Sequence, residues 1–278
     1  MSERHIAYTD RDGNRARVAY TRAGHGSPVV LIHGVGLRGA VWAPQVEALR
    51  ADHDVIAVDM PGHGGSSLPP ADVTLAHYAD AILALLDALK IGRAHVVGHS
   101  MGALVAMEFA LAHPERAAGL VAMNAVFCRT PEQRAAIEAR VAALGDALGD
   151  ALGDGPARPD WNGTIGRWFG DPVPPSLEAA AARTRALLSE IDPVGYRRTY
   201  RLFARSDAEH RERLPRLAAP ALFVTGEHDP NSTPSMSEAM AAIAPRGRAI
   251  VLPGERHIMA LTDPDRTNRG FREFIGRA

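Results

Sequence analysis

A serine at position 100 lies between two glycines in the stretch HVVGHSMGAL, residues 95–104. A short apolar run precedes Gly98, and a helical pattern follows Gly102. A strand, a G-x-S-x-G turn and a helix together form a nucleophile elbow, in which a sharp turn exposes the serine hydroxyl at the end of the strand. We expect a side chain at either glycine to collide with adjacent backbone in such a turn. The pattern therefore predicts that Ser100 is a nucleophile.

Two more residues with the chemistry of acyl transfer end later strand patterns. Asp229 ends the run PALFVTGEHD, and His257 ends the run RAIVLPGERH. An imidazole can accept the proton of a serine hydroxyl, and a carboxylate fixes the tautomer of that imidazole and stabilises its charged form. We therefore predict a catalytic triad of Ser100, His257 and Asp229.

Other residues compete for the role of the acid. Glu227 lies two residues before Asp229, and Asn124 follows the preceding strand pattern. Asparagine cannot supply a negative charge, which favours Asp229 over Asn124. The base has no rival near the final strand, because His257 is the last histidine and His228 precedes it by a whole helix and strand pattern.

The loop His33-Gly34-Val35-Gly36 ends an earlier apolar run. Its glycines let the backbone turn, so we expect the Val35 N–H to point toward the serine. Together with the N–H of Met101, the residue after the serine, it would form an oxyanion hole for the charge that develops on a carbonyl oxygen. Gly34 and His33 are predicted members of the same binding loop. We expect His33 to orient this loop, and direct contact with a substrate is the alternative.

Strand patterns alternate with helical patterns over most of the chain. A hairpin pattern opens it, with HIAYTD and ARVAYTRAG on either side of a turn. Apolar runs typical of buried strands and helical patterns then follow in turn. The strand runs begin at 28, 54, 94, 119, 220 and 248, and the helical patterns cover 74–89, 101–113, 235–243 and 264–275. This alternation predicts an α/β fold with a mostly parallel central sheet flanked by helices.

The alternation stops between residues 128 and 215, where only helical patterns occur. We expect this stretch to form a helical cap subdomain, inserted into a core domain of residues 1–127 and 216–278. Within it, the repeat LGDALGDALGD at 144–154 is expected to be a surface element. Trp168 or Phe169 is expected to line the substrate pocket. The arginines of the cap are nearly balanced by acidic residues, so the composition indicates a solvated surface and does not itself indicate a carboxylate-binding arginine.

The bulk composition excludes several classes of protein. The 278 residues carry a net charge of −1, so no strong field attracts nucleic acid or an anionic membrane. The single cysteine cannot form an internal disulfide. The polar N-terminal stretch lacks the apolar run of a signal peptide, and no segment approaches the roughly 18 apolar residues of a membrane span. We expect a cytoplasmic bacterial protein with a small-molecule substrate and no nucleic-acid or membrane partner. The sequence does not decide whether the protein forms a homo-oligomer.

The sequence resembles the α/β-hydrolase fold superfamily over nearly its whole length. The resemblance is carried by HGVG at 33–36, DMPGHGGS at 59–66, GHSMG at 98–102, GEHD at 226–229 and GERH at 254–257. The order Ser, Asp, His along the chain is also that of this superfamily. The most similar branch contains bacterial esterases, lactonases, cofactor-free haloperoxidase-like enzymes and C–C hydrolases. Dehalogenases and epoxide hydrolases of this fold use an aspartate nucleophile, and the serine at position 100 argues against both.

The resemblance implies a serine hydrolase that cleaves a small carboxylic ester, lactone or thioester through an acyl-enzyme, with no metal and no cofactor. One alternative is hydrolysis of a C–C bond in a diketone-type intermediate of aromatic degradation. That branch often has an arginine and a tryptophan of the cap near the site. Perhydrolysis by a haloperoxidase-like enzyme and a small-molecule receptor on this fold are further alternatives.

Overall fold

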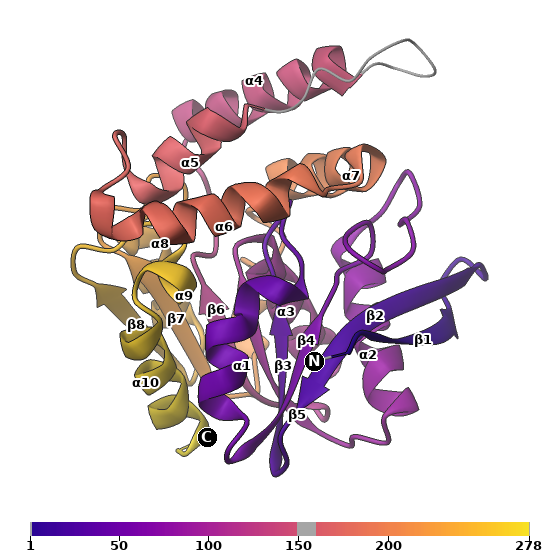
Figure 1. Ribbon diagram of the computed structural model, residues 1–278. Helices are drawn as coiled ribbons and strands as arrows, with labels where there is room; N and C mark the ends of the chain where they lie inside the picture. The colour runs from indigo at the N-terminus through magenta and orange to yellow at the C-terminus, as the bar shows by residue number, and fades with distance from the viewer. Residues whose placement is uncertain (1, 149–159, 278) are drawn as a thin grey trace.

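The computed structural model describes residues 2–148 and 160–277 of the chain. In this part, eight strands form one sheet in the order β1-β2-β4-β3-β5-β6-β7-β8 (Figure 1). Strand β1 is antiparallel to β2, β2 is antiparallel to β4, and every other pairing is parallel. The prediction of an α/β fold with a mostly parallel sheet is therefore confirmed. The strands are β1 Arg4–Thr9, β2 Arg15–Ala23, β3 Ser27–Ile32, β4 His53–Val58, β5 Ala94–His99, β6 Ala117–Met123, β7 Ala221–Gly226 and β8 Gly247–Leu252.

The central strands carry apolar side chains on both of their faces because both faces of the sheet are covered. Alternate residues of β3 show this directly. Val30 and Ile32 pack into a core with helices α2, α3 and α8, whereas Val29 and Leu31 pack into a second core with α1 and α10. Continuous apolar runs in the sequence correspond to this arrangement. The helices are α1 Ala43–Leu49, α2 Leu75–Ala88, α3 Met101–Ala112, α8 Pro234–Ile243, α9 Met259–Thr262 and α10 Pro264–Ile275.

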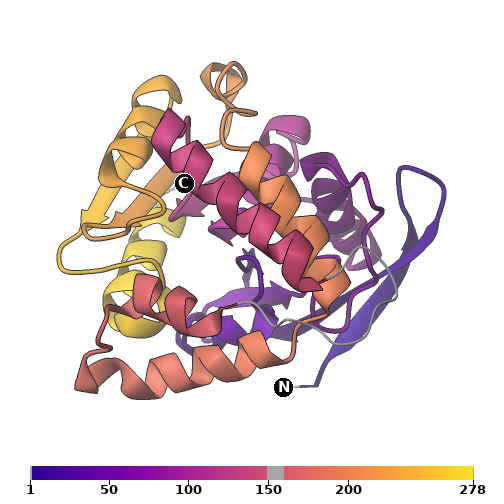
Figure 2. The same ribbon diagram turned by 90° about the horizontal axis from the view of Figure 1, so that it is seen from above.

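Four helices lie between β6 and β7 in the chain and cross one end of the sheet in space (Figure 1). They pack as two pairs, α4 with α7 and α5 with α6 (Figure 2). No described residue of this segment lies in a strand. Its separation from the core as a cap subdomain, with boundaries at 128 and 215, stays a prediction. The four helices are α4 Pro131–Leu148, α5 Trp161–Phe169, α6 Glu178–Ser189 and α7 Pro193–Arg205.

Helix α5 was not anticipated by its residue pattern, because two of its nine residues, Gly163 and Gly166, are poor helix formers. The side chain of Asp160 caps its start by accepting a hydrogen bond from the Gly163 N–H at 2.9 Å. The repeat at 144–154 lies largely outside the described residues. Its first residue, Leu144, belongs to the last turns of α4, and its side chain is buried.

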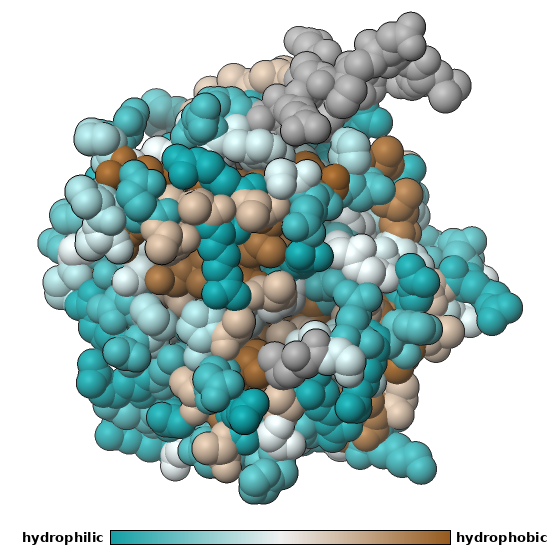
Figure 3. All heavy atoms as spheres, in the orientation of Figure 1, coloured by the Kyte–Doolittle hydropathy of each residue, from teal (hydrophilic) through white to brown (hydrophobic). Residues whose placement is uncertain are grey.

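The described surface exposes few large apolar side chains. Leu68 is the single exposed large hydrophobic residue among those described. The face in Figure 3 is mostly hydrophilic, with smaller apolar patches beneath the helices that cross the end of the sheet. Across the described ranges, no helix combines the length and hydrophobicity needed to span a membrane.

A buried ion pair joins the start of the four-helix segment to its end. The Asp207 carboxylate accepts a hydrogen bond from the backbone N–H of Arg129 at 2.8 Å and pairs with the Arg129 guanidinium at 3.3 Å and with Arg134 at 3.1 Å. The N–H of Cys128 donates to the Asp207 carbonyl oxygen at 2.9 Å. The Asp207 side chain is fully buried and that of Arg129 is 4% exposed. Asp207 therefore fixes the chain leaving β6 against the chain that follows α7.

We expect Asp207→Asn to lower the free energy of unfolding by about 3 kcal/mol, because the variant leaves the buried Arg129 guanidinium without its counter-charge. Urea denaturation of wild type and variant measures the difference. Asp72→Asn is the matched control, since Asp72 is exposed and forms no ion pair with any described residue, and it should stay within about 0.5 kcal/mol of wild type. A change below 1 kcal/mol in Asp207→Asn would contradict this account.

Candidate active site

The predicted turn at Ser100 is present between β5 and α3. Ser100 has a φ of 55° and a ψ of −115°, a left-handed conformation that costs a non-glycine residue about 1–3 kcal/mol. Its N–H donates to the carbonyl oxygen of Met123 at 2.8 Å. A Cβ atom at Gly98 would overlap the backbone of Gly102, and one at Gly102 would overlap the carbonyl groups of Ile32 and His33. The two glycines are therefore required by close backbone contacts on both sides of the serine.

His257 and Asp229 form a buried hydrogen-bonded pair. His257 Nδ1 lies 2.8 Å from Asp229 Oδ2, and the side chains are 2% and 0% exposed. Because an ionised carboxylate can only accept hydrogen bonds, Nδ1 carries the proton when the ring is neutral. Nε2 is then unprotonated, and its lone pair can accept a proton. The Asn124 amide and the backbone N–H of Asn231 also donate to the Asp229 carboxylate, at 2.7 and 2.8 Å.

Burial of Asp229 alone would raise the pKa of its carboxyl group. The charge on His257 and the hydrogen bonds from His257, Asn124 and Asn231 outweigh burial, so the pKa lies below its usual value. Asp229 is therefore ionised at neutral pH and can stabilise an imidazolium. Asn124, the rival candidate for the acid, instead donates a hydrogen bond to Asp229.

Two aromatic rings hold His257 in place. The ring centroid of His99 lies 4.9 Å from that of His257, and the Trp168 ring lies 5.5 Å away at an angle of 33°. His99 Nε2 also lies 2.7 Å from the backbone carbonyl oxygen of His257, so this nitrogen is protonated and donates. Trp168 comes from α5, and this contact joins the helices above the sheet to His257.

The loop that contains Val35 is held by two histidines. The Met60 N–H donates to His33 Nε2 at 2.9 Å, so His33 Nδ1 carries a proton and donates to the Gly34 carbonyl oxygen at 2.8 Å. The Gly36 N–H donates to His63 Nε2 at 3.1 Å. His33 is completely buried beneath the loop and does not line the cavity. Its hydrogen bonds orient the loop, as the sequence analysis expected.

The amides predicted for the oxyanion hole are free of protein acceptors. Within the described residues, neither the Val35 N–H nor the Met101 N–H donates to a backbone or side-chain group. Met101 begins α3, so its N–H also belongs to the unpaired first turn of a helix, where negative charge is favoured. These two groups are available to an oxygen atom bound near Ser100.

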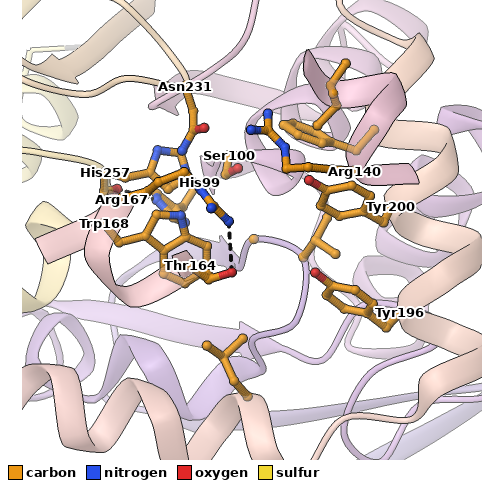
Figure 4. A pocket seen from close by; sticks show the side chains of 15 residues that line it. His99, Ser100, Arg140, Thr164, Arg167, Trp168, Tyr196, Tyr200, Asn231 and His257 are labelled. Atoms are coloured by element: carbon orange, nitrogen blue, oxygen red, sulfur yellow. Dashed lines mark hydrogen bonds between the residues drawn. The ribbon is translucent and has the colours of Figure 1, made fainter. Parts of the chain in front are cut away.

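Ser100 and His257 line one cavity of about 600 Å³, a volume that includes its open mouth (Figure 4). Of the other predicted site residues, Gly34, Val35 and Trp168 also line it. Phe169 is 2% exposed and packs in the hydrophobic core with Ile165 instead of lining the cavity. Sequence reasoning missed several polar side chains of the cavity, because helix periodicity alone does not tell which face of an inserted helix meets the core. They are Arg140, Thr164, Arg167, Tyr196, Tyr200 and Asn231.

The model of the protein family described as alpha/beta hydrolase fold matches residues 27–264. This chain belongs to that family. An (E)-2-((N-methylformamido)methylene)succinate hydrolase of Acinetobacter baylyi is 33% identical to it over 97% of this chain and 98% of its own length. The 3-oxoadipate enol-lactonase 1 of the same organism is 28% identical over 99% of this chain and 98% of its own. The solved structure of a thermophilic esterase from Thermogutta terrifontis, with malate bound, has a TM-score of 0.85 and 25% identity, and covers 99% of this chain and 98% of its own. The protein is therefore an enzyme of the α/β-hydrolase fold, a hydrolase among esterases and lactonases.

The histidines around the site make the stability of this hydrolase depend on pH. Burial lowers the pKa of His33 to about 4, and burial together with a neighbouring histidine lowers that of His63 and His99 to about 3. An unfolded histidine takes up a proton near pH 6.5, whereas these three stay neutral in the folded protein. The stability that they contribute is complete above pH 6.5 and is lost as the pH falls from 6.5 toward their folded pKa values.

Because each of these histidines stays neutral in the folded protein, each should lower the free energy of unfolding by about 2 kcal/mol when the pH falls from 7.5 to 5. Urea denaturation at the two pH values should therefore give a decrease of several kcal/mol for wild type. His63→Gln should show a smaller decrease, and His25→Gln, which alters an exposed histidine, should match wild type. Equal stability of wild type at pH 7.5 and pH 5 would refute the buried neutral state.

Proposed function

We propose that this hydrolase cleaves a small carboxylic ester, lactone or thioester through a covalent acyl-enzyme on Ser100. The observation that carries the proposal is the buried His257–Asp229 hydrogen bond beside the cavity that Ser100 also lines. The left-handed turn at Ser100 supports it, because strain of this kind persists at nucleophile elbows.

In the proposed reaction, His257 Nε2 takes the proton of the Ser100 hydroxyl while the serine oxygen attacks the substrate carbonyl carbon. The Val35 and Met101 N–H groups bind the oxyanion, and loss of one such donor costs about 3–4 kcal/mol of transition-state stabilisation. The bond to the leaving group then breaks, and His257 gives that group its proton. A water molecule, deprotonated by His257, attacks the acyl-enzyme; release of the acid returns the proton to Ser100.

The relatives support a small substrate. One of them is named for a succinate derivative and another for an enol-lactone, and both match nearly the whole of this chain. An ester, an enol-lactone or a thioester each presents a carbonyl and a leaving group that this mechanism can use.

A second candidate is hydrolysis of a C–C bond beside a carbonyl. One observation favours it. Trp168, Arg140 and Arg167, all from the helices above the sheet, line the cavity. An arginine and a tryptophan in this position are typical of the C–C hydrolases that the sequence resembles. Comparing kcat/KM for a vinylogous 1,5-diketone with kcat/KM for an ester separates the two reactions. Faster turnover of the diketone would replace the first proposal with the second.

We expect Ser100→Ala to lower kcat on p-nitrophenyl acetate at least about 1,000-fold, because the variant has no atom to form the acyl-enzyme. Wild type should release a burst of one p-nitrophenol per active site. A phosphonate inhibitor should add to Ser100, as located by mass spectrometry of peptides. Ser66→Ala is the control and should bind the phosphonate as wild type does, since Ser66 lies in the loop of His63 and does not line the cavity. Activity retained by Ser100→Ala would reject the mechanism.

A further inference from the structure

The cavity that contains Ser100 is positively charged on two sides. Arg140 reaches it from α4 and Arg167 from α5, so the two guanidinium groups enter from the two different helix pairs (Figures 2 and 4). None of the described residues that line the cavity is an aspartate or a glutamate. Asp229 lies behind His257, is 3% exposed and is not part of the lining.

Neither arginine has an acidic partner among the described residues. Arg140 Nε is buried and has no hydrogen-bond partner. Arg167 makes one hydrogen bond, from Nη2 to the neutral hydroxyl of Thr164 at 3.0 Å (Figure 4). Elsewhere in the same helical segment, buried arginine is paired, as Arg129 is with Asp207. A buried guanidinium donor without a partner is unfavourable in the empty cavity, and a bound anion would satisfy it.

The position of the two arginines decides which anion fits. They share a cavity with Ser100 and with the ring of Trp168, which packs on His257, so a molecule held by them lies against the reacting groups. The planar guanidinium fork matches the two oxygens of a carboxylate. We propose that Arg140 and Arg167 bind a free carboxylate of the substrate, so that the substrate is an acidic ester or lactone with one carboxylate besides the carbonyl under attack. This proposal rests on the proposed serine mechanism and adds the substrate class to it.

The placement corrects the expectation from composition. Arginines and acidic residues are nearly balanced over residues 128–215, which indicated a solvated surface. Among the described residues that line the cavity the balance does not hold, since Arg140 and Arg167 belong to the lining and no aspartate or glutamate does.

A pair of esters of equal length tests the proposal. Mono-p-nitrophenyl glutarate carries a free carboxylate, and p-nitrophenyl valerate carries a methyl group at the corresponding end. Wild type should hydrolyse the acidic ester with a kcat/KM at least about tenfold above that of the neutral ester, the effect of one charge-assisted interaction. Glutarate should inhibit competitively, and neutral glutaramide should inhibit at least about tenfold more weakly.

Arg140→Gln and Arg167→Gln should each lower the ratio of the two kcat/KM values at least about fivefold. Both rates come from one sample, so a loss of folded protein leaves the ratio unchanged. Arg201→Gln is the matched control, because Arg201 is exposed on α7 and does not line the cavity; its ratio should stay within about twofold of wild type.

Equal kcat/KM values for the two esters in wild type would overturn the carboxylate proposal and leave the serine mechanism intact. A fall in the ratio that is as large in Arg201→Gln as in Arg140→Gln would also overturn it, because a general field would then explain the preference. Undiminished hydrolysis of both esters by Ser100→Ala would instead overturn the serine mechanism itself.

Discussion

Strand β5 turns into helix α3 at Ser100 through two close backbone contacts that leave no room for a side chain at positions 98 and 102. A Cβ atom at Gly98 would overlap the first turn of α3, and one at Gly102 would overlap the carbonyl groups at the end of β3. These contacts hold Ser100 in its left-handed conformation and place the free N–H of Met101 next to it. They also bring the end of β3, and with it the loop of Val35, to the same point. Ser100 and the two free amides are thus positioned by one set of close backbone contacts.

Neutral histidines support this arrangement in a way that charged residues could not. His33, His63 and His99 are each buried, and each forms at least one hydrogen bond with a backbone group near the site. A neutral imidazole provides a donor and an acceptor on one rigid ring, and burial keeps it neutral. The loops at 33–36 and 59–66 are therefore held to each other by the rings of His33 and His63, neither of which lines the cavity.

The cavity lies where two separate cores meet. The pair α4 and α7 packs with the core on one face of the sheet, and the pair α5 and α6 packs with the core on the other. The two pairs meet through Trp161 of α5, whose ring lies 5.5 Å from that of Tyr196 of α7, and both apolar and polar side chains line the cavity beside this contact. Trp168 from one pair stacks on His257, and Tyr196 from the other stacks on Tyr200 at 5.6 Å.

The sequence alone determined the sheet, the order of its elements and the turn at Ser100. These features depend on local patterns: apolar runs for strands covered on both faces, helical periodicity, and glycines where the backbone has no room. The positions of Asp229 and His257 could be predicted because side chains that follow parallel strands meet at one edge of the sheet. The same reasoning anticipated that His33 would orient its loop.

Only the tertiary structure decided which side chains of residues 128–215 reach the cavity. Trp168 lines it and its neighbour Phe169 does not, although both are large aromatic residues of one helix. Arg140 and Arg167 line the cavity without an acidic partner among the residues that the structure describes, a property that no count of charges in the segment contains. The physical reason is that an inserted helix is oriented by its contacts with distant parts of the chain, and those contacts select the face that meets the substrate.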